Sequence, residues 1–204
     1  MAKVSEAVRS TLTSAATGYR APGHYLKTTF ESKGVTVLGA GMYGAAIEEN
    51  GNIFKIFGKE EKGYGAYLNY LKGKSSVLNP RVKVIGSFGA FTCVHIERLH
   101  HMGDEIGHDL AYAFAEWASY VARKAFNKAG GDEWFCKAPF PKGAEQFVNK
   151  ANMAGMLKKL AVFAYNHFKE NEQDMTWDLH SGNFMVRRNE DGTKQIVLTD
   201  PFCA

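Results

Sequence analysis

The chain has 204 residues, of which 45% are hydrophobic and 23% are charged, and its formal net charge is +4. This is the composition of a soluble globular protein with one domain or two closely packed lobes. The mild positive charge suits an anionic ligand such as a nucleotide, but no run of Lys and Arg is dense enough to predict nucleic-acid binding. The densest run, Arg187-Arg188 with Lys194, is predicted to form a solvated face.

The cysteines and the apolar runs argue against several further classes of protein. Cys93, Cys136 and Cys203 lack Cys-x-x-Cys spacing, so they predict neither a zinc site nor a disulfide framework. No apolar run reaches membrane-spanning length, and the N-terminus lacks the apolar core of a signal peptide. We therefore expect no membrane partner and a cytoplasmic location.

The first half of the chain is rich in predicted strands. Residues 4–19 have the apolar spacing of a short amphipathic helix, and the stretch APGHY after it is typical of a turn. Residues 35–57 hold three short β-like runs, with Asn50-Gly51 as the hairpin turn between the second and third. A helix over residues 60–73 follows, and residues 81–99 then contain two strands.

The second half, from about residue 100, is predominantly helical. Its first long helix carries an apolar stripe that ends near Gly130-Gly131, and a loop with two prolines leads into a second long helix. The strands FMVRR and QIVLTD then flank an Asp191-Gly192 turn. The pattern predicts an α+β protein in which a strand-rich lobe precedes a helical lobe.

The loop GAGMYG places Gly39, Gly41 and Gly44 at G-x-G-x-x-G spacing. Glycines at this spacing let backbone N–H groups approach phosphate oxygens that a Cβ would keep away. A dinucleotide-binding fold needs a helix after such a loop, but the residues after Gly44 contain a hairpin turn instead. The loop is therefore predicted to join two antiparallel strands, as in protein kinases. A flexible hairpin without a ligand is the alternative.

The strand after the hairpin, NIFKIF, carries one cation, Lys55, among apolar residues. A lysine on a buried strand is costly unless its charge is used. Lys55 is therefore predicted to lie beneath the glycine loop and to reach the α- and β-phosphates of a nucleotide. The alternative is an edge-strand lysine whose ammonium group extends to solvent.

The C-terminal stretch DLHSGN sets Asp178 and Asn183 at D-x-x-x-x-N spacing, and Asp200 follows the strand IVLT. Phosphoryl transfer needs a carboxylate that positions the acceptor hydroxyl and oxygen ligands for Mg²⁺ near the phosphates of ATP. The hairpin between the two stretches is expected to return Asp200 to the side of Asn183, so that the three residues gather at one edge.

Together these stretches resemble the protein-kinase fold, and more narrowly the early serine/threonine protein kinase of short-tailed, T-seven-like lytic bacteriophages. The similar stretches are VLGAGMYGAA, KEEKGYGAYLNYL, WDLHSGNFM and TDPF, and the resemblance covers roughly residues 34–202. It implies a bilobal fold with an N-terminal helical extension (1–33), an N-lobe (34–99) and a reduced helical C-lobe (100–204). The C-lobe would end just after the metal-binding Asp.

For the N-lobe, the resemblance implies that the three loop glycines cover the ATP phosphates and that Lys55 binds them. Glu97 lies in the stretch VHIERL, whose backbone would hydrogen-bond adenine. The acidic partner of Lys55 would be Glu60 or Glu61, because YLNYL stands where the helix usually supplies that glutamate.

For the C-lobe, the resemblance implies that Asp178 orients or deprotonates the acceptor hydroxyl and that Asn183 and Asp200 hold Mg²⁺. Thr176 stands where kinases often have His, and Pro201 replaces the Phe of Asp-Phe-Gly, as it does in the bacteriophage family. ATP and Mg²⁺ are thus the expected cofactors.

The function that the resemblance implies is phosphorylation of host proteins, such as those of transcription and RNA processing, in the host cytoplasm early in infection. The stretch DLHSGN also resembles the DLHPGN loop of aminoglycoside and choline kinases, so a small-molecule kinase is one alternative. A kinase-fold protein that binds and inhibits a host protein without catalysis is the other.

Overall fold

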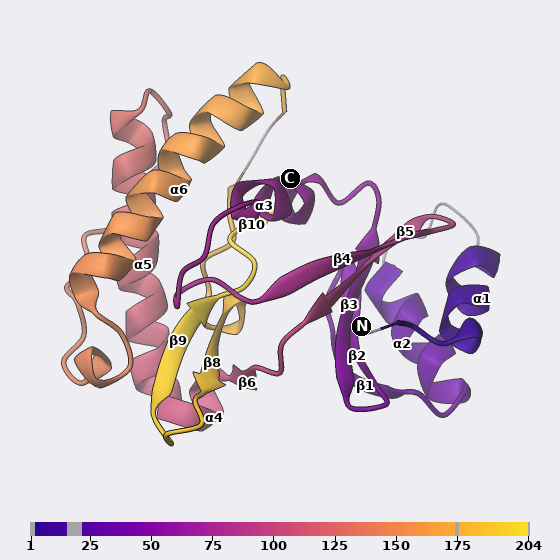
Figure 1. Ribbon diagram of the computed structural model, residues 1–204. Helices are drawn as coiled ribbons and strands as arrows, with labels where there is room; N and C mark the ends of the chain where they lie inside the picture. Colours follow the sequence, from indigo (N-terminus) through magenta and orange to yellow (C-terminus); the bar gives the residue numbers. More distant parts are fainter. Residues whose placement is uncertain (1–2, 16–21, 174–175, 204) are drawn as a thin grey trace. The chain divides into compact units, whose positions relative to one another are not determined.

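The computed structural model describes residues 3–15, 22–173 and 176–203 (Figure 1). It combines a five-stranded sheet, two smaller sheets and several helices, which confirms the α+β class. The chain divides into two compact units. The first unit comprises Met1–Glu61 and Arg81–Arg98, and the second comprises Lys62–Pro80 and Leu99–Ala204.

The first unit is built on an antiparallel sheet with the strand order β1-β2-β3-β5-β4. The strands are β1 (Thr36–Ala40), β2 (Gly44–Glu49), β3 (Asn52–Gly58), β4 (Val82–Phe88) and β5 (Phe91–Ile96). Asn50 and Gly51 have φ values of 49° and 74°, the left-handed conformation that a tight hairpin turn requires. All five strands and this turn lie where the sequence predicts them.

Two helices pack on the same sheet (Figure 1). The first, α1 (Glu6–Ser14), begins after Ser5, whose hydroxyl accepts a hydrogen bond from the Val8 N–H. Its predicted extension over residues 16–19 lies outside the described residues. The second, α2 (Pro22–Ser32), corrects the prediction of a turn in APGHY, because Pro22 is the first helical residue. Proline is favoured there since the first turn of a helix leaves its N–H groups unbonded.

The second unit contains two long helices, α5 (His108–Lys128) and α6 (Lys150–Glu170), which lie side by side (Figure 1). The shorter helix α3 (Lys62–Leu71) packs against α6 and against the C-terminal strand β10 (Phe202–Cys203). The sequence prediction placed this helix in the N-lobe. The structure groups it with the second unit, because its buried tyrosines contact aromatic rings there: Tyr67 packs on Phe202 and Tyr70 on Phe163.

The remaining elements of the second unit are short. One sheet consists of β6 (His100–His101), β8 (Phe184–Arg188) and β9 (Lys194–Leu198), and β7 (Thr176–Trp177) pairs with β10. The unit also holds the helix α4 (Met102–Ile106) and the single 3₁₀ turns η1 (Ala144–Gln146) and η2 (Ser181–Asn183). In the part of the chain that the structure describes, no helix has the length and apolar character to cross a membrane.

The prediction of a solvated basic face at the β8–β9 hairpin is wrong for Arg187. Its side chain is 6% exposed, and its guanidinium group donates hydrogen bonds to the carbonyl groups of Val77 (2.7 Å) and Asn79 (2.8 Å). Arginine can serve in this way because its planar group offers several donors at once. Arg187 therefore anchors the segment after α3 to the hairpin.

The other two cations of the hairpin meet at Glu105 of α4. Its carboxylate accepts a hydrogen bond from Arg188 Nε (3.0 Å) and lies 3.0 Å from Lys194 Nζ, and its side chain is only 4% exposed. The hydrogen bond from Arg188, helped by that from Lys194, lowers the pKa of Glu105 from its ordinary 4.5 to about 2, although burial acts in the opposite direction. The hairpin is thus fixed to α4 by a charged contact.

This contact predicts a pH-dependent stability. A carboxyl whose pKa is lowered by folding stabilises the folded state above its unfolded pKa, and this contribution is lost as the pH falls from about 4.5 toward about 2. We expect Glu105→Gln to cost about 1–2 kcal/mol at pH 7, since Arg188 is largely exposed and the contact is partly screened. Urea unfolding at several pH values measures the difference.

The matched control is Asp104→Asn, since Asp104 neighbours Glu105 and its side chain is 72% exposed. It should change stability little at any pH. If Glu105→Gln lowered the free energy of unfolding by the same amount at pH 3.5 as at pH 7, the role given to the ionised carboxylate would be contradicted.

Candidate functional site

The glycine-rich loop is the tight connection between β1 and β2, which confirms the predicted antiparallel hairpin. The Gly41 N–H donates to the Gly44 carbonyl (2.9 Å), and the Gly58 N–H donates to the Tyr43 carbonyl (3.1 Å). Met42 and Tyr43, between the second and third glycines, are 62% and 40% exposed. The loop therefore presents its tip to solvent while its base is bonded to the sheet.

The fold requires only one of the three loop glycines. A Cβ on Gly44 would lie 2.3 Å from the Ile56 carbonyl oxygen of β3, so close packing excludes any larger residue. A Cβ on Gly39 or Gly41 would have no neighbour within 4 Å, and neither residue has a φ in the left-handed region. Within the described residues, neither packing nor backbone conformation accounts for a glycine at these two positions.

A fourth glycine supports the loop and was missed in the sequence. Gly23, in the first turn of α2, donates from its N–H to the Met42 carbonyl (3.3 Å). A Cβ on Gly23 would lie 1.8 Å from the Gly41 carbonyl oxygen, a distance at which atoms overlap. The start of α2 thus packs directly on the loop. The available signal was Pro22, which marks a helix start as readily as a turn.

Lys55 occupies the middle of the sheet. It pairs with Ala46 of β2 and Val94 of β5, and β3 is the central strand, so the edge-strand alternative is wrong. Its neighbours Phe54 and Ile56 belong to the core that the sheet forms with α1 and α2. Because side chains alternate along a strand, Lys55 lies on the opposite face, where it is half-buried.

The acidic residues of the first unit differ in burial. Glu61 is 8% exposed whereas Glu60 is exposed, so Glu61 is the better candidate to pair with a buried cation. Glu97 is engaged with Arg81: its N–H donates to the Arg81 carbonyl (3.1 Å), and its carboxylate accepts from the Arg81 N–H (2.7 Å). The N–H of Glu97 is therefore bonded within the first unit, and the adenine contact expected from the backbone of the stretch VHIERL stays a prediction.

In the second unit, Asn183 organises the DLHSGN loop. Its Nδ2 donates to the main-chain carbonyl (2.7 Å) and to the carboxylate (2.9 Å) of Asp178. The His180 ring accepts a hydrogen bond from the Gly182 N–H at Nδ1 (3.0 Å), and its Nε2 lies 3.5 Å from Asp178 Oδ1. The same Nε2 lies 3.1 Å from Asn183 Nδ2, so the ring contacts both Asp178 and Asn183. Asp178 is thus oriented by two side chains of its own loop.

The β8–β9 hairpin returns the chain to this loop. Both the N–H and the hydroxyl of Thr199 donate to the Asn183 carbonyl, each at 2.9 Å. The Asp178 N–H donates to the Pro201 carbonyl, also at 2.9 Å. Asp200 is the residue between these two anchors, so the structure brings it together with Asn183 and Asp178.

Helix α3 also helps to position Asp200. The Tyr67 side chain is fully buried, and its hydroxyl donates to the Leu198 carbonyl at 2.7 Å, two residues before Asp200. Burial raises the pKa of Tyr67 well above its ordinary value, and the nearby Tyr64, Tyr70 and Asp200 add to this. The phenol therefore remains a neutral donor. The sequence did not reveal this contact, because it joins residues far apart in the chain.

The donor set at this loop suits Mg²⁺ better than a transition metal. Asn183 and Asp200 offer one amide and one carboxylate group, and Mg²⁺ in nucleotide sites is held by one or two such groups together with phosphates and waters. Among residues 3–15, 22–173 and 176–203, no group of three or more His, Cys, Asp or Glu side chains is placed to hold a metal ion.

The predicted site residues form two sets, one in each unit. The loop glycines and Lys55 lie in the first, and Asp178, Asn183 and Asp200 lie in the second. No protein-family model matches this chain, and a search of curated proteins finds no match. The functional assignment therefore rests on the chemistry of these two sets.

The packing of α2 on the glycine loop gives a test of stability. We expect Gly23→Ala to lower the free energy of unfolding by about 1–3 kcal/mol, because the added Cβ overlaps the Gly41 carbonyl oxygen. Gly41→Ala, which meets open space, should change it by less than about 1 kcal/mol. Urea titration followed by circular dichroism measures both. Equal stability of the two variants would show that α2 does not support the loop.

Proposed function

We propose that this protein is an ATP-dependent phosphotransferase with a protein-kinase-like fold. The observation that carries the proposal is the set of three residues in the second unit. Asn183 donates to Asp178, and Asp200 lies between Thr199, which donates to Asn183, and Pro201, which accepts from Asp178. An acidic residue for the acceptor and two oxygen ligands for Mg²⁺ are the groups that phosphoryl transfer needs. Their joint placement by a loop and a returning hairpin has no evident purpose in packing alone, since Asp178 and Asn183 are only half-buried.

The first unit supports the same proposal independently. A glycine-rich hairpin followed by a central-strand lysine is the arrangement with which kinases hold the phosphates of ATP. Gly39 and Gly41 are not required by the fold, but a phosphate that approaches the loop would require them, because a Cβ would keep its oxygens from the backbone N–H groups. Lys55 would bind these phosphates, and Glu61 is its proposed acidic partner.

The proposed reaction follows from the roles of these residues. The acceptor hydroxyl oxygen attacks the γ-phosphorus of ATP, the bond to the β–γ bridging oxygen breaks, and ADP leaves. Asp178 orients the hydroxyl and accepts its proton, while His180 and Asn183 hold the carboxylate in place. Bound Mg²⁺ would neutralise charge on the phosphates, held by Asn183 and Asp200.

The proposed acceptor is a serine or threonine hydroxyl of a host protein, in line with the bacteriophage kinases that the motifs resemble. Host proteins of transcription and RNA processing are the expected substrates. The stretch DLHSGN by itself favours a small-molecule acceptor equally well, so the test must resolve labelled proteins from labelled small molecules.

Replacement of Asp178 tests the chemistry. We expect Asp178→Asn to lower the rate of phosphate transfer about 10²–10⁴-fold, because the amide cannot accept the proton. Affinity for Mg-ATP should stay near that of the wild type, since the amide oxygen can still accept from Asn183. Labelled ATP with a bacterial lysate measures transfer, and calorimetric titration measures binding.

Each outcome of this experiment decides between the candidate functions. Labelled protein bands that disappear in the variant support a protein kinase, and labelled small molecules alone would point to a small-molecule kinase. Absence of any transfer by the wild type would leave the non-catalytic binding protein as the explanation.

Replacement of Lys55 tests the first unit. We expect Lys55→Ala to reduce transfer at least about tenfold through loss of its contact with the phosphates, which corresponds to about 1.4 kcal/mol of transition-state stabilisation. Lys59→Ala is the matched control, because Lys59 is the exposed residue just after the same strand. Full activity of Lys55→Ala at saturating ATP and at low ATP alike would refute the role of Lys55.

A further inference from the structure

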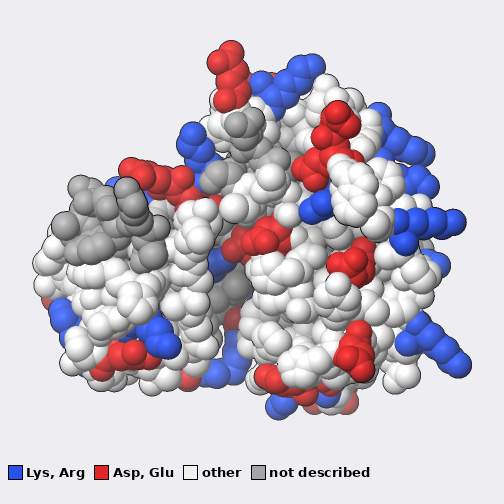
Figure 2. Space-filling view, turned by 180° about the vertical axis from the view of Figure 1, so that it is seen from behind, with Lys and Arg blue, Asp and Glu red and all other residues white. Residues whose placement is uncertain are grey.

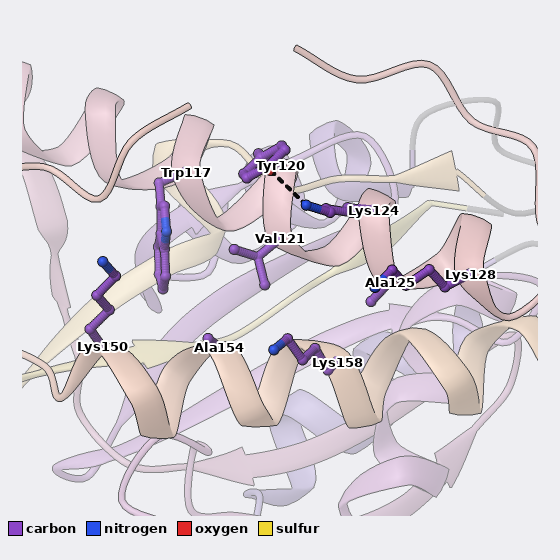
Figure 3. Close-up of a pocket in the computed structure, with 9 residues that line it drawn as sticks. All are labelled: Trp117, Tyr120, Val121, Lys124, Ala125, Lys128, Lys150, Ala154 and Lys158. Carbon is purple, nitrogen blue, oxygen red and sulfur yellow. Dashed lines mark hydrogen bonds between the residues drawn. The ribbon is translucent and has the colours of Figure 1, made fainter. Parts of the chain in front are cut away.

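A groove of about 400 Å³ runs between α5 and α6 in the second unit, outside the candidate site (Figure 3). Side chains from both helices line it: Trp117, Tyr120, Val121, Lys124, Ala125, Lys128, Lys150, Ala154 and Lys158. The α6 members recur every four residues, so they form one stripe along the helix that faces α5 (Figure 3). Ala125 of α5 and Ala154 of α6 are the smallest of the lining side chains.

The groove has an apolar floor and a cationic rim. Trp117 is 3% exposed and, with Val121 and Ala154, forms an apolar surface, while the four lysines are all exposed. None of the nine lining residues is acidic. None of the four lysines forms an ion pair with any of the residues that the structure describes, although other lysines of this unit, such as Lys194, do so. Figure 2 shows Lys and Arg side chains projecting along the side where these helices lie.

Two of the lysines also contact aromatic side chains in or beside the groove. Lys124 Nζ donates to the Tyr120 hydroxyl (3.1 Å), the bond drawn in Figure 3. This bond is the main cause of a lowered pKa for Tyr120, and Lys128 and Lys137 add to it. Lys150 Nζ lies 5.4 Å from the centre of the Phe140 ring, its only aromatic contact among the described residues. Four like charges around one groove produce a positive potential there, which favours a bound anion.

We propose that this groove binds an acidic segment of a partner protein in an extended conformation. Lys124 and Lys128 are one helical turn apart, about 6 Å, and Lys150 and Lys158 are two turns apart, about 12 Å. Along an extended chain, alternate side chains are about 7 Å apart and every fourth about 13 Å apart. Acidic residues at alternate positions can therefore meet the lysines of either helix, and apolar residues between them can contact the floor.

The composition of the groove favours a protein segment over nucleic acid. Arginine is absent from the lining residues, and the apolar floor offers nothing to a phosphate backbone. Carboxylates on an amphipathic segment satisfy both the rim and the floor. The inference does not depend on phosphotransfer, since the groove shares no residue with the candidate site.

The test uses the full chain and a fluorescein-labelled peptide of alternating glutamate and leucine, followed by fluorescence anisotropy. The variant Lys150→Glu/Lys158→Glu should weaken binding of the peptide at least about tenfold, because like charges would then face each other across the interface. The control Lys142→Glu/Lys159→Glu makes the same change in net charge at exposed lysines outside the groove, and it should bind nearly as the wild type does.

A second variant separates the groove from charge alone. Ala154→Leu fills the floor without changing any charge, and it should also weaken binding, with helix content unchanged by circular dichroism. The proposal would be overturned if Lys150→Glu/Lys158→Glu and the control Lys142→Glu/Lys159→Glu bound the peptide with equal affinity. It would also be overturned if the wild type bound a peptide of alternating glutamine and leucine as tightly as the glutamate–leucine peptide. Displacement of the peptide by duplex DNA at lower concentration than by unlabelled peptide would assign the groove to nucleic acid instead, and so would also overturn it.

Discussion

The candidate site depends on the hydrogen bonds of one residue, Asn183. Its carbonyl accepts two bonds from Thr199, and its side-chain amide donates two to Asp178. A single amide-bearing residue thus joins the loop to the strand that follows the hairpin. The arrangement uses the Nδ2 donors for structure and leaves the amide oxygen as the group suited to a hard cation. For the proposed magnesium site, an Asn, which has both donors and an acceptor, therefore suits the position better than an Asp.

The first unit shows how a fold can support a loop without filling the space above it. Gly44 is glycine because β3 packs against it, and Gly23 of α2 is glycine because the backbone of the loop packs against it. Gly39 and Gly41 face open space. Packing therefore holds the base of the loop on one side, and the other side stays accessible. A loop that must approach phosphates closely needs both properties, because a mobile backbone would lose orientation and a packed one would exclude the ligand.

The sequence predicted the local features well and the long-range ones poorly. Hairpin turns such as Asn50-Gly51 and the alternation of apolar residues are encoded within a few neighbours, so the strands of the first unit were found at their observed positions. The D-x-x-x-x-N loop with its following hairpin was recognisable for the same reason. Burial of Arg187 and the Tyr67 hydrogen bond to Leu198 were not, because each is decided by a partner more than a hundred residues away. Proline at position 22 was ambiguous, since its fixed φ suits a turn and a helix start alike.

The cations of the second unit show that charge in the sequence says little until partners are known. Arg187, Arg188 and Lys194 looked like a solvated face, yet backbone carbonyls bind the first and Glu105 binds the other two. The lysines of α5 and α6 are dispersed along the sequence and predict no binding site, yet the packing of the two helices gathers four of them around one groove. Adjacent cations whose charge is satisfied inside the fold contribute to stability. Dispersed cations that the fold gathers without a carboxylate leave a positive potential at the surface, and for that reason the groove is where we place an acidic partner.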